Sequence, residues 1–306
     1  MMGKTWSKPE QWLRPGLKIV GKWHQNEYVL KRKLGQGAIG TVYLCEMNGQ
    51  LVALKMSEKN TSMTMEVNVL KSLEKARDHC LGPSLLDVDD WQPPHGPVLS
   101  FYVMEYIQGE PLRTFLQRNG TDWLGVFMLQ LLDDLDKLHE AGWVCGDLKL
   151  ENLLVTNTPP RIRWIDVGGT TKIGRAIKEY TEFYDRGYWG MGSRKAEPSY
   201  DLFAFAMVCI GLFYASTFER GKQQPEVLIR RRLHRVQTLR PFEACIMKAI
   251  TGKYRSAKQM HQDISHVLQQ MKAKKRDSSS SDAFLMEGAG MLLLAGGYYL
   301  LSLFIP

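Results

Sequence analysis

The chain has 306 residues, of which 44% are hydrophobic and 10% aromatic, so it can bury one large or two modest cores. This composition excludes a chain that is disordered throughout. A formal net charge of +8 favours a polyanionic partner, either nucleic acid or an acidic membrane surface, without choosing between them. The five cysteines are scattered and never form a Cys-x-x-Cys pair, which is typical of core thiols in a reducing cytosol.

The first fifteen residues contain no apolar run, so we expect no amino-terminal signal peptide. Alternating apolar residues then predict strands over Tyr28–Leu34 and Thr41–Glu46. The dipeptide Asn48-Gly49 predicts a two-residue hairpin that leads into a third strand, Leu51–Lys55. Apolar residues at helical spacing in Met65–Leu73 predict a helix after these strands.

The first two predicted strands flank a glycine-rich loop, Gly35-Gln-Gly-Ala-Ile-Gly40. Glycines without a Cβ let backbone amides approach phosphate groups closely. Because a strand and not a helix follows this loop, the pattern disfavours a dinucleotide-binding fold. By itself the loop is weak evidence, since a plain hairpin can carry the same glycines.

The centre of the chain carries the chemistry. It reads Gly146-Asp-Leu-Lys-Leu-Glu-Asn-Leu-Leu154 and, after a short turn, Ile165-Asp-Val-Gly168. Phosphoryl transfer needs an acceptor hydroxyl held in line, divalent metal on the phosphate oxygens and a cation against the developing charge. Two carboxylates, one ammonium group and one amide can meet these needs, and they belong to Asp147, Lys149, Asn152 and Asp166.

Two basic clusters follow. Arg230-Arg-Arg232 with His234 and Arg235 forms either a solvated helix face or an anion dock. Lys272-Ala-Lys-Lys-Arg276 precedes a serine-rich linker that cannot build a core. Each cation beside an anionic leaflet gains about 1 kcal/mol. DNA phosphates offer the same attraction, and any such binding should be independent of sequence and weaken steeply with salt.

The end of the chain, Gly288–Ile305, carries no charge. As a helix that rises about 1.5 Å per residue, it nearly spans a hydrocarbon core about 30 Å thick. We expect a single carboxy-terminal membrane anchor, although a helix packed on the globular part would also fit. Because lysine and arginine favour the cytoplasmic side, the globular part should face the cytoplasm.

Together these segments resemble a protein kinase of the Hanks type, from about Tyr28 to about Gln270. The motifs follow in the family's order: glycine loop, strand lysine, helix glutamate, hinge, catalytic loop and Asp-x-Gly. The resemblance implies an α+β, two-lobed fold that binds ATP with Mg²⁺ or Mn²⁺ between the lobes. The surrounding residues, such as Ile177–Gly190, are similar to those of small membrane kinases of spore-forming bacilli, which implies a role in sporulation.

The resemblance also implies a role for each matched residue. Asp147 would be the catalytic base and Lys149 the γ-phosphate contact of serine/threonine kinases, while Asn152 and Asp166 would be metal ligands. Glu66 would pair with Lys55, which would contact the α- and β-phosphates. The nucleotide would bind residues of the glycine loop, the strands and the hinge, namely Gly35, Gly37, Gly40, Val42, Ala53, Lys55, Glu66, Met104, Glu105 and Tyr106.

Three departures from the family limit what can be transferred. Cys145-Gly146-Asp147 replaces His-Arg-Asp, so no arginine beside the base can pair with a phosphorylated activation segment. Val167 replaces the phenylalanine of Asp-Phe-Gly, which predicts a looser distinction between inactive and active states. Ala196-Glu-Pro198 stands too close to the next helix to be the family's Ala-Pro-Glu, and Lys253 takes the place of the arginine that would pair with that glutamate.

Two alternatives remain open. Small-molecule kinases of the aminoglycoside and choline kinase kind carry His-Gly-Asp, to which Gly146-Asp147 is similar, but they generally lack a counterpart of Lys149. The second alternative is a weakly catalytic nucleotide-binding scaffold at the membrane. It is disfavoured because the sequence lacks none of the charged catalytic groups. Phosphate turnover with magnesium would distinguish it. His139 is expected to pack at the end of a core helix without a chemical role.

We divide the chain into an extension (1–24), an N-lobe (25–107), a C-lobe (108–271), a linker (272–287) and an anchor (288–305). The expected partners are protein substrates, anionic lipid, non-specific DNA and a second copy of the chain in transient self-association. We also expect autophosphorylation, at Thr170, Thr171 and Thr181 within the activation segment and at Ser278–Ser281 outside it.

Overall fold

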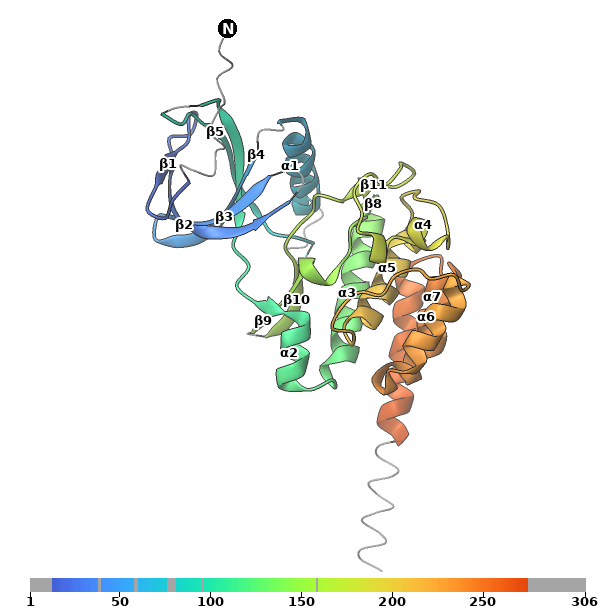
Figure 1. Cartoon of the computed structure of the whole chain (residues 1–306). Coiled ribbons are helices and arrows are strands. Elements are labelled where there is room, and N and C mark those ends of the chain that lie inside the picture. The colour runs from blue at the N-terminus through green and yellow to red at the C-terminus, as the bar shows by residue number, and fades with distance from the viewer. Residues whose placement is uncertain are drawn as a thin grey trace, which may run out of the picture.

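The computed structural model describes residues 13–37, 40–57, 60–75, 81–94, 96–157 and 159–274. Figure 1 shows two lobes, an upper one built around a sheet and a lower one built mainly from helices. The predicted α+β class and two-lobed arrangement are therefore confirmed. The predicted anchor Gly288–Ile305, the serines Ser278–Ser281 and Cys80 lie outside the described residues.

The N-lobe sheet has the strand order β1-β2-β3-β4-β6-β5, and each pair of neighbours is antiparallel. The predicted meander of three strands forms its middle, and Asn48 and Gly49 both have positive φ, 50° and 78°, as a tight two-residue hairpin requires. The six strands are β1 (Lys18–Val20), β2 (Glu27–Gln36), β3 (Thr41–Met47), β4 (Gln50–Ser57), β5 (Leu85–Trp91) and β6 (Leu99–Glu105).

Two features of this lobe matter for the site. The predicted helix is α1 (Asn60–Lys75), whose apolar face, with Val67 and Leu70, joins the main hydrophobic core. Strand β1 pairs with β2, so the sheet begins before residue 25, the predicted start of the lobe. Its alternation is too short to distinguish a strand from a loop in the sequence.

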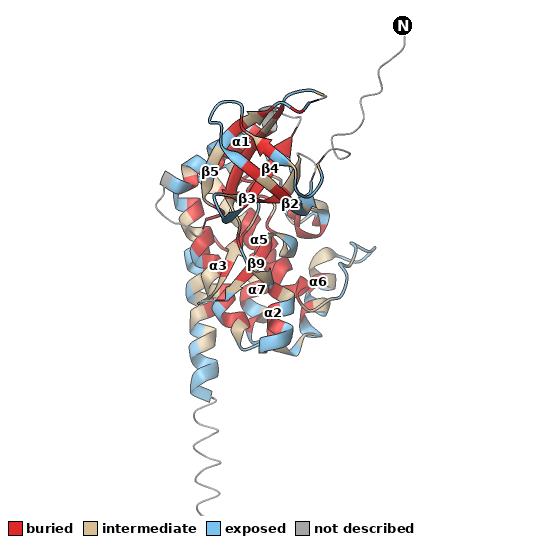
Figure 2. Cartoon of the chain, turned by 90° about the vertical axis from the view of Figure 1, so that its left-hand side faces the viewer, coloured by how far each residue is buried: buried red, intermediate tan, exposed pale blue. Residues whose placement is uncertain are grey.

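The C-lobe surrounds α5 (Pro198–Gly211), which is buried along almost its whole length, as a helix that is apolar all round must be (Figure 2). Around it lie α2 (Leu112–Asn119), α3 (Trp123–Glu140), α4 (Arg186–Trp189), α6 (Pro225–His234) and α7 (Glu243–Ile250). The short strands form two small sheets, β10-β9-β7 and β11-β8. These strands are β7 (Glu110–Pro111), β8 (Trp143–Val144), β9 (Leu153–Asn157), β10 (Pro160–Trp164) and β11 (Thr171–Lys172).

The described part of the lobe also has short 3₁₀ segments at Leu150–Asn152, Glu182–Tyr184 and Gln237–Phe242. Residues 257–274 are helical, so the helix continues past residue 271, the predicted end of the lobe. Within the described ranges, no helix combines the length and the apolar character that crossing a membrane requires. Four cysteines, Cys45, Cys145, Cys209 and Cys245, are buried free thiols. Burial raises the pKa of Cys45 to about 12, which keeps this thiol protonated and unreactive.

Candidate active site

A buried ion pair joins the sheet to α1. The Nζ of Lys55 on β4 lies 2.7 Å from Oε2 of Glu66, and these side chains are only 7% and 2% exposed. Tyr102 of β6 donates a hydrogen bond of 2.6 Å to the same Glu66 oxygen. The second Glu66 oxygen, Oε1, has no hydrogen-bond partner among the described residues. The pair predicted from the sequence thus fixes the position of α1 against the sheet.

Lys55 also faces the metal-binding loop, because its Nζ lies 3.5 Å from Oδ1 of Asp166. Burial lowers the pKa of Lys55, but the carboxylates of Asp166 and Glu66 outweigh it and raise that pKa above its ordinary value. Lys55 is therefore a fixed cation at neutral pH. Burial, followed by the charge of Glu66, raises the pKa of Tyr102 well above its usual value, so Tyr102 stays a donor.

Asp147 lies in the loop between β8 and the first 3₁₀ segment. Its Oδ2 contacts the Nζ of Lys149, and its Oδ1 accepts a hydrogen bond of 2.9 Å from the hydroxyl of Thr181. The Lys149 Nζ also lies 3.4 Å from that hydroxyl. The Asn152 side chain donates to the carbonyl of Asp147 at 3.4 Å. Base, lysine and amide therefore form one connected group, as the spacing predicted, and Thr181 joins it from the activation segment.

Gly146 explains why this chain has no arginine before its base. It has a φ of 78°, and a Cβ at this position would lie 2.3 Å from the carbonyl oxygen of Gly169. Gly169 is equally constrained, since its own Cβ would lie 2.6 Å from the Cβ of Asp147. The catalytic and metal-binding loops thus approach each other too closely for any side chain at residue 146. The predicted lack of an arginine partner at this position has a steric cause.

Asp201 of α5 holds the catalytic loop from below. Its carboxylate accepts hydrogen bonds from the backbone N–H of Cys145 at 2.8 Å and of Gly146 at 3.0 Å. His139, at the end of α3, contacts the same carboxylate through Nε2 at 2.9 Å. The side chains of Asp201, Cys145 and His139 are all buried. His139 therefore positions the loop through Asp201, whereas the sequence assigned it packing alone.

The end of the activation segment is fastened differently from the resembled family. The buried Asp185 caps α4 by accepting from the N–H groups of Gly187 and Tyr188. Arg186 forms an ion pair of 2.7 Å with Glu197, which directly precedes α5. The glutamate of Ala196-Glu-Pro198 thus pairs with an arginine of its own segment and not with Lys253.

Val167 is buried in the same hydrophobic core as Leu70 and Leu73 of α1. A Cβ on Gly82 would lie 2.9 Å from its side chain. Gly82 therefore packs closely against the smaller valine. The looser switching predicted from this residue stays a prediction.

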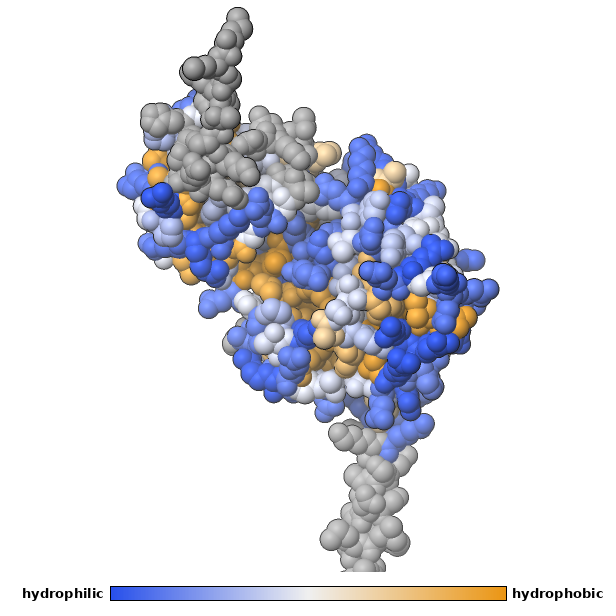
Figure 3. Space-filling view, viewed as in Figure 1, coloured by the Kyte–Doolittle hydropathy of each residue, from blue (hydrophilic) through white to orange (hydrophobic). Residues whose placement is uncertain are grey.

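A cavity of about 500 Å³ lies between the lobes, where Figure 3 shows apolar surface in the gap between them. It brings together twelve of the fourteen predicted site residues: Gly35, Gly37, Gly40, Val42, Ala53, Lys55, Met104, Glu105, Tyr106, Lys149, Asn152 and Asp166. Glu66 lies behind Lys55, and Asp147 beside Lys149. Residues that sequence reasoning did not assign also line the cavity, among them Leu34, Ile107, Glu151 and Leu154.

The hinge is joined to the C-lobe by an arginine that no sequence motif marks. Arg163 of β10 makes two hydrogen bonds to the Glu105 carboxylate, at 3.2 and 2.9 Å. It also donates to the carbonyl of Gly82 at 3.1 Å. The same carboxylate accepts from the N–H of Ser84 at 3.2 Å. The Glu105 side chain therefore fastens the hinge, and its backbone N–H donates to the carbonyl of Ser84 at 2.9 Å.

Comparison with known proteins agrees with this geometry. The protein kinase domain family matches residues 28–284. The chain is 48% identical over 270 residues to the serine/threonine-protein kinase YabT of Bacillus subtilis, covering 88% of this chain and 80% of that protein. It is 26% identical over 232 residues to the sporulation protein kinase mde3 of Schizosaccharomyces pombe, covering 67% and 41%. To the kinase ppk25 of the same yeast it is 31% identical over 157 residues, covering 49% and 35%.

The chain belongs to the protein kinase family, and it is similar to a bacterial member of that family over most of its length. Protein kinases use ATP and Mg²⁺. The residues fit both groups, because the cavity combines apolar walls such as Ala53 and Met104 with a fixed cation, Lys55. Asp166 and Asn152 offer the oxygen ligands that Mg²⁺ prefers.

Proposed function

We propose that this kinase transfers the γ-phosphoryl group of ATP to serine and threonine hydroxyls of proteins, its own chain included, at the cytoplasmic face of a membrane. The enzyme is a serine/threonine protein kinase, as its similarity to YabT supports. The observation that carries this assignment is the hydroxyl of Thr181, 2.9 Å from Asp147 and 3.4 Å from Lys149. An aliphatic hydroxyl already reaches the base in the way that an acceptor must.

Each charged side chain has a task in this reaction. Asp147 orients the acceptor hydroxyl and accepts its proton, while Lys149 offsets negative charge between the base and the acceptor. Lys55, held by Glu66, would contact the nucleotide phosphates. Asp166 and Asn152 would hold the magnesium, which when bound neutralises charge on the phosphate oxygens.

The alternatives receive less support. A small-molecule kinase would not need Lys149, which here contacts Asp147 directly. A scaffold without activity would not need both ion-paired groups, Lys55 with Glu66 and Asp166, and Asp147 with Lys149. The similarity of the chain to kinases named for serine and threonine also favours a protein acceptor.

The predicted sites of autophosphorylation differ in their surroundings. Thr170 is buried, Thr171 is half-buried, and the hydroxyl of Thr181 is engaged by Asp147. Phosphorylation of Thr181 would remove the hydroxyl that contacts the base, so modification there should slow transfer. Thr170 and Thr171 are free of this conflict.

Membrane attachment and control by polyanions belong to the same proposal. The stretch Gly288–Ile305 has no charge, and basic residues from Lys272 onward precede it. Both features support a membrane anchor that leaves the kinase domain on the cytoplasmic side. Arg230 and Arg231 of α6 and Arg235 just after it are exposed; Arg230 also pairs with Glu226, and Arg232 lies over Tyr214 and Phe218. A polyanion such as DNA or an anionic leaflet would gather copies of the kinase for mutual phosphorylation.

The activity is tested by incubating the full chain with ATP, magnesium and a generic protein acceptor, followed by phosphosite mapping. We expect phosphoserine and phosphothreonine on both the acceptor and the kinase. A second arm adds anionic or neutral vesicles, or double-stranded DNA, across a salt series. Stimulation by the anionic partners that fades with salt supports the polyanion control. Phosphate confined to tyrosine, or to a small-molecule acceptor, would contradict the assignment.

A further inference from the structure

A cluster of polar side chains, which the reaction proposed above does not use, lies where the two edge strands of the N-lobe sheet meet. Strands β1 and β5 stand at opposite ends of the strand order β1-β2-β3-β4-β6-β5. The sheet nevertheless curls so far that the backbone N–H of Lys22, just after β1, donates to the carbonyl of Asp90 on β5 at 2.8 Å. Figure 1 shows β1 and β5 on the same side of the upper lobe. The loop of residues 21–26 thus closes the sheet against β5.

Asp89 of β5 is at the centre of this contact, and its side chain is fully buried. Its Oδ1 accepts a hydrogen bond from the backbone N–H of Trp23 at 2.9 Å, and its Oδ2 accepts one from the N–H of His24 at 2.8 Å. A Cβ on Gly21 would lie 2.3 Å from Oδ2, so the glycine leaves the room that this oxygen occupies. The loop therefore supplies both the donors for the carboxylate and the space for it.

Asp87, two residues earlier on β5, is held in a similar way, and its side chain is 7% exposed. Its Oδ1 accepts a hydrogen bond from the N–H of Val88 at 2.7 Å. Its Oδ2 accepts from the side chain of Asn26 at 2.9 Å and from the hydroxyl of Tyr28. Because donors face both oxygens of Asp87 and of Asp89, both side chains are ionised carboxylates in fixed positions.

These two buried carboxylates are not matched by positive charge. Among the described residues, neither forms an ion pair with a lysine or an arginine, and their shared partner is His24. The Nδ1 of His24 lies 2.6 Å from Oδ1 of Asp87 and 3.9 Å from Oδ2 of Asp89. An imidazole carries at most one positive charge, so the cluster keeps at least one excess negative charge. Because buried charges in proteins are paired or coordinate metals, this excess favours a bound cation.

The ligand atoms of the cluster lie close to the spacing that a metal ion needs. The Nδ1 of His24, one oxygen of Asp87 and one oxygen of Asp89 all lie within 4.8 Å of one another. Bonds from zinc to nitrogen and oxygen are about 2.0 to 2.2 Å long, which separates two ligands of a tetrahedral ion by about 3.3 Å. The observed 2.6 and 3.9 Å lie on either side of this value. His24 is 58% exposed, so its ring can shift while the buried carboxylates stay in place.

We propose that His24, Asp87 and Asp89 bind a divalent transition metal ion such as Zn²⁺, which fastens the two edges of the N-lobe sheet together. An imidazole nitrogen with carboxylate oxygens suits this class of ion, whereas Mg²⁺ prefers oxygen ligands alone. Three protein ligands leave a fourth position for water. The hydrogen bonds from Trp23 and Asn26 orient the two carboxylates, and such contacts raise the affinity of a metal site.

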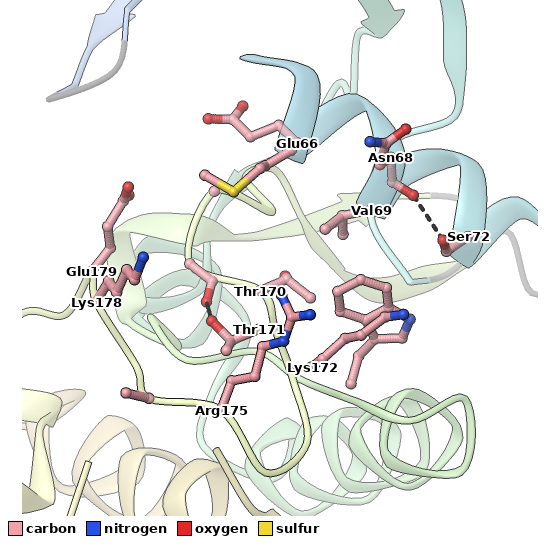
Figure 4. Close-up of a pocket in the computed structure, with 15 residues that line it drawn as sticks. Glu66, Asn68, Val69, Ser72, Thr170, Thr171, Lys172, Arg175, Lys178 and Glu179 are labelled. Carbon is pink, nitrogen blue, oxygen red and sulfur yellow. Dashed lines mark hydrogen bonds between the residues drawn. The ribbon is translucent and has the colours of Figure 1, made fainter. Parts of the chain in front are cut away.

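This site is separate from the two large cavities beside the reacting groups. A cavity of about 430 Å³ lies beneath α1, where Figure 4 shows Glu66 and Glu179 among the side chains around it. Neither that cavity nor the nucleotide cavity has a histidine, or any residue of the cluster, among the described residues that line it. A metal ion that takes an imidazole ligand therefore distinguishes the cluster from the carboxylates of the active site.

The test is titration of Co²⁺ into the full chain in detergent micelles, with excess Mg²⁺ present to fill sites built from oxygen ligands. Tetrahedral Co²⁺ absorbs visible light far more strongly than the hydrated ion, so the absorption reports binding. We expect one Co²⁺ to bind the wild type, with an absorption that added Zn²⁺ removes. Saturating Zn²⁺ should also raise Tm by a few degrees, because the ion binds the folded lobe alone.

The variants distinguish this site from adventitious binding. His24→Gln removes the nitrogen ligand at an exposed position, so the fold should stay intact while the affinity for Co²⁺ falls about tenfold or more. Asp87→Asn should lower the affinity similarly. His234→Gln is the matched control, since His234 is also exposed and its Nδ1 lies 3.2 Å from the Glu243 carboxylate. This control should bind Co²⁺ like the wild type, and circular dichroism without metal checks the fold of each variant.

Two results would overturn the site. One is a wild-type chain with which the Co²⁺ absorption stays that of the hydrated ion. The other is equal affinity for Co²⁺ in the wild type and in His24→Gln. A Tm that does not rise with saturating Zn²⁺ would overturn the role of the ion in closing the sheet. No step of this test needs phosphoryl transfer, so its outcome is independent of the function proposed above.

Discussion

At the scale of single residues, the site depends on the position of Asp147, which its neighbours hold in place. Asp147 is contacted on one oxygen by Lys149 and on the other by Thr181. Gly146, one residue earlier, lies so close to Gly169 that no side chain fits. The base is thus positioned by a lysine, a hydroxyl and a steric constraint, and each can be removed separately.

Thr181→Val removes the hydroxyl and keeps the shape of the side chain. A hydrogen bond to a charged group contributes about 1.5 to 3 kcal/mol, so we expect the transfer rate to fall roughly tenfold or more while ATP affinity stays the same. Steady-state kinetics with a fixed protein acceptor measures both. Thr181→Ser restores the hydroxyl and should recover most of the rate. If Thr181→Val transfers phosphate as fast as the wild type, the hydroxyl does not position the base.

Gly146→Ala has a matched control in Gly142→Ala. Both glycines have positive φ, 78° and 83°, so alanine costs each about 1 to 2 kcal/mol of backbone strain. Only Gly146 also has a backbone oxygen 2.3 Å from the new Cβ, whereas Gly142 has nothing within 4 Å. We expect Gly146→Ala to lower Tm further and to abolish transfer, while Gly142→Ala keeps most of its activity. Equal losses in the two variants would contradict the steric account.

At the scale of elements, the lobes are joined by contacts between strands and loops that are distant in sequence. Arg163 on β10 binds Glu105 at the end of β6 and the carbonyl of Gly82. Asp201 on α5 binds the backbone of the catalytic loop. Because β10 leads directly to Asp166, the arginine links the hinge to the metal-binding loop.

Arg163→Met tests this link. The variant leaves the Glu105 carboxylate and the Gly82 carbonyl without their donor, so we expect a loss of about 1 to 3 kcal/mol in the free energy of unfolding. A displaced hinge should raise KM for ATP severalfold and change kcat less. A double-mutant cycle with Glu105→Gln separates the pair from other effects, and a coupling energy near zero would show that the two side chains act independently.

These contacts also show what the sequence could and could not predict. Lys55, Asp147, Asn152 and Asp166 were predicted because their motifs are local, and the strands because alternation and the Asn48-Gly49 turn are local signals. Thr181, Arg163 and Asp201 contact partners 34, 58 and 55 residues away. An isolated threonine, arginine or aspartate carries no sign of such a partner. β1 was missed because three residues are too few to show a period.

At the scale of the whole molecule, the net charge of +8 is distributed over surfaces that are not equally available. On α6, Arg230 is paired with Glu226, and Arg232 lies 5.0 Å from the ring centroid of Phe218. Arg230, Arg231 and Arg235 are all exposed, but Arg231 and Arg235 have no such contact within the described part of the chain. The density of basic residues in the sequence therefore overstates the number that are free of contacts within the protein.

This difference predicts that the arginines contribute unequally to DNA binding. Replacing Arg231 and Arg235 together by alanine should lower the affinity for double-stranded DNA and reduce the slope of log affinity against log salt by about 2. Replacing Arg230 and Arg232 should have a smaller effect, since both are already engaged within the protein. Fluorescence anisotropy over a salt series measures both quantities. Equal effects of the two pairs would show that the internal contacts do not compete with DNA.

The central claim is that Asp147 is the base of the transfer, while Lys55, Asp166 and Asn152 hold ATP and magnesium. It is tested most directly by single-turnover transfer from radiolabelled ATP to a protein acceptor, comparing the wild type with Asp147→Asn. The account predicts a rate at least about 100-fold lower in the variant, with unchanged affinity for ATP and magnesium, since removal of a general base commonly has such an effect. A wild-type rate in the variant would contradict the assignment of the base and with it the proposed active site.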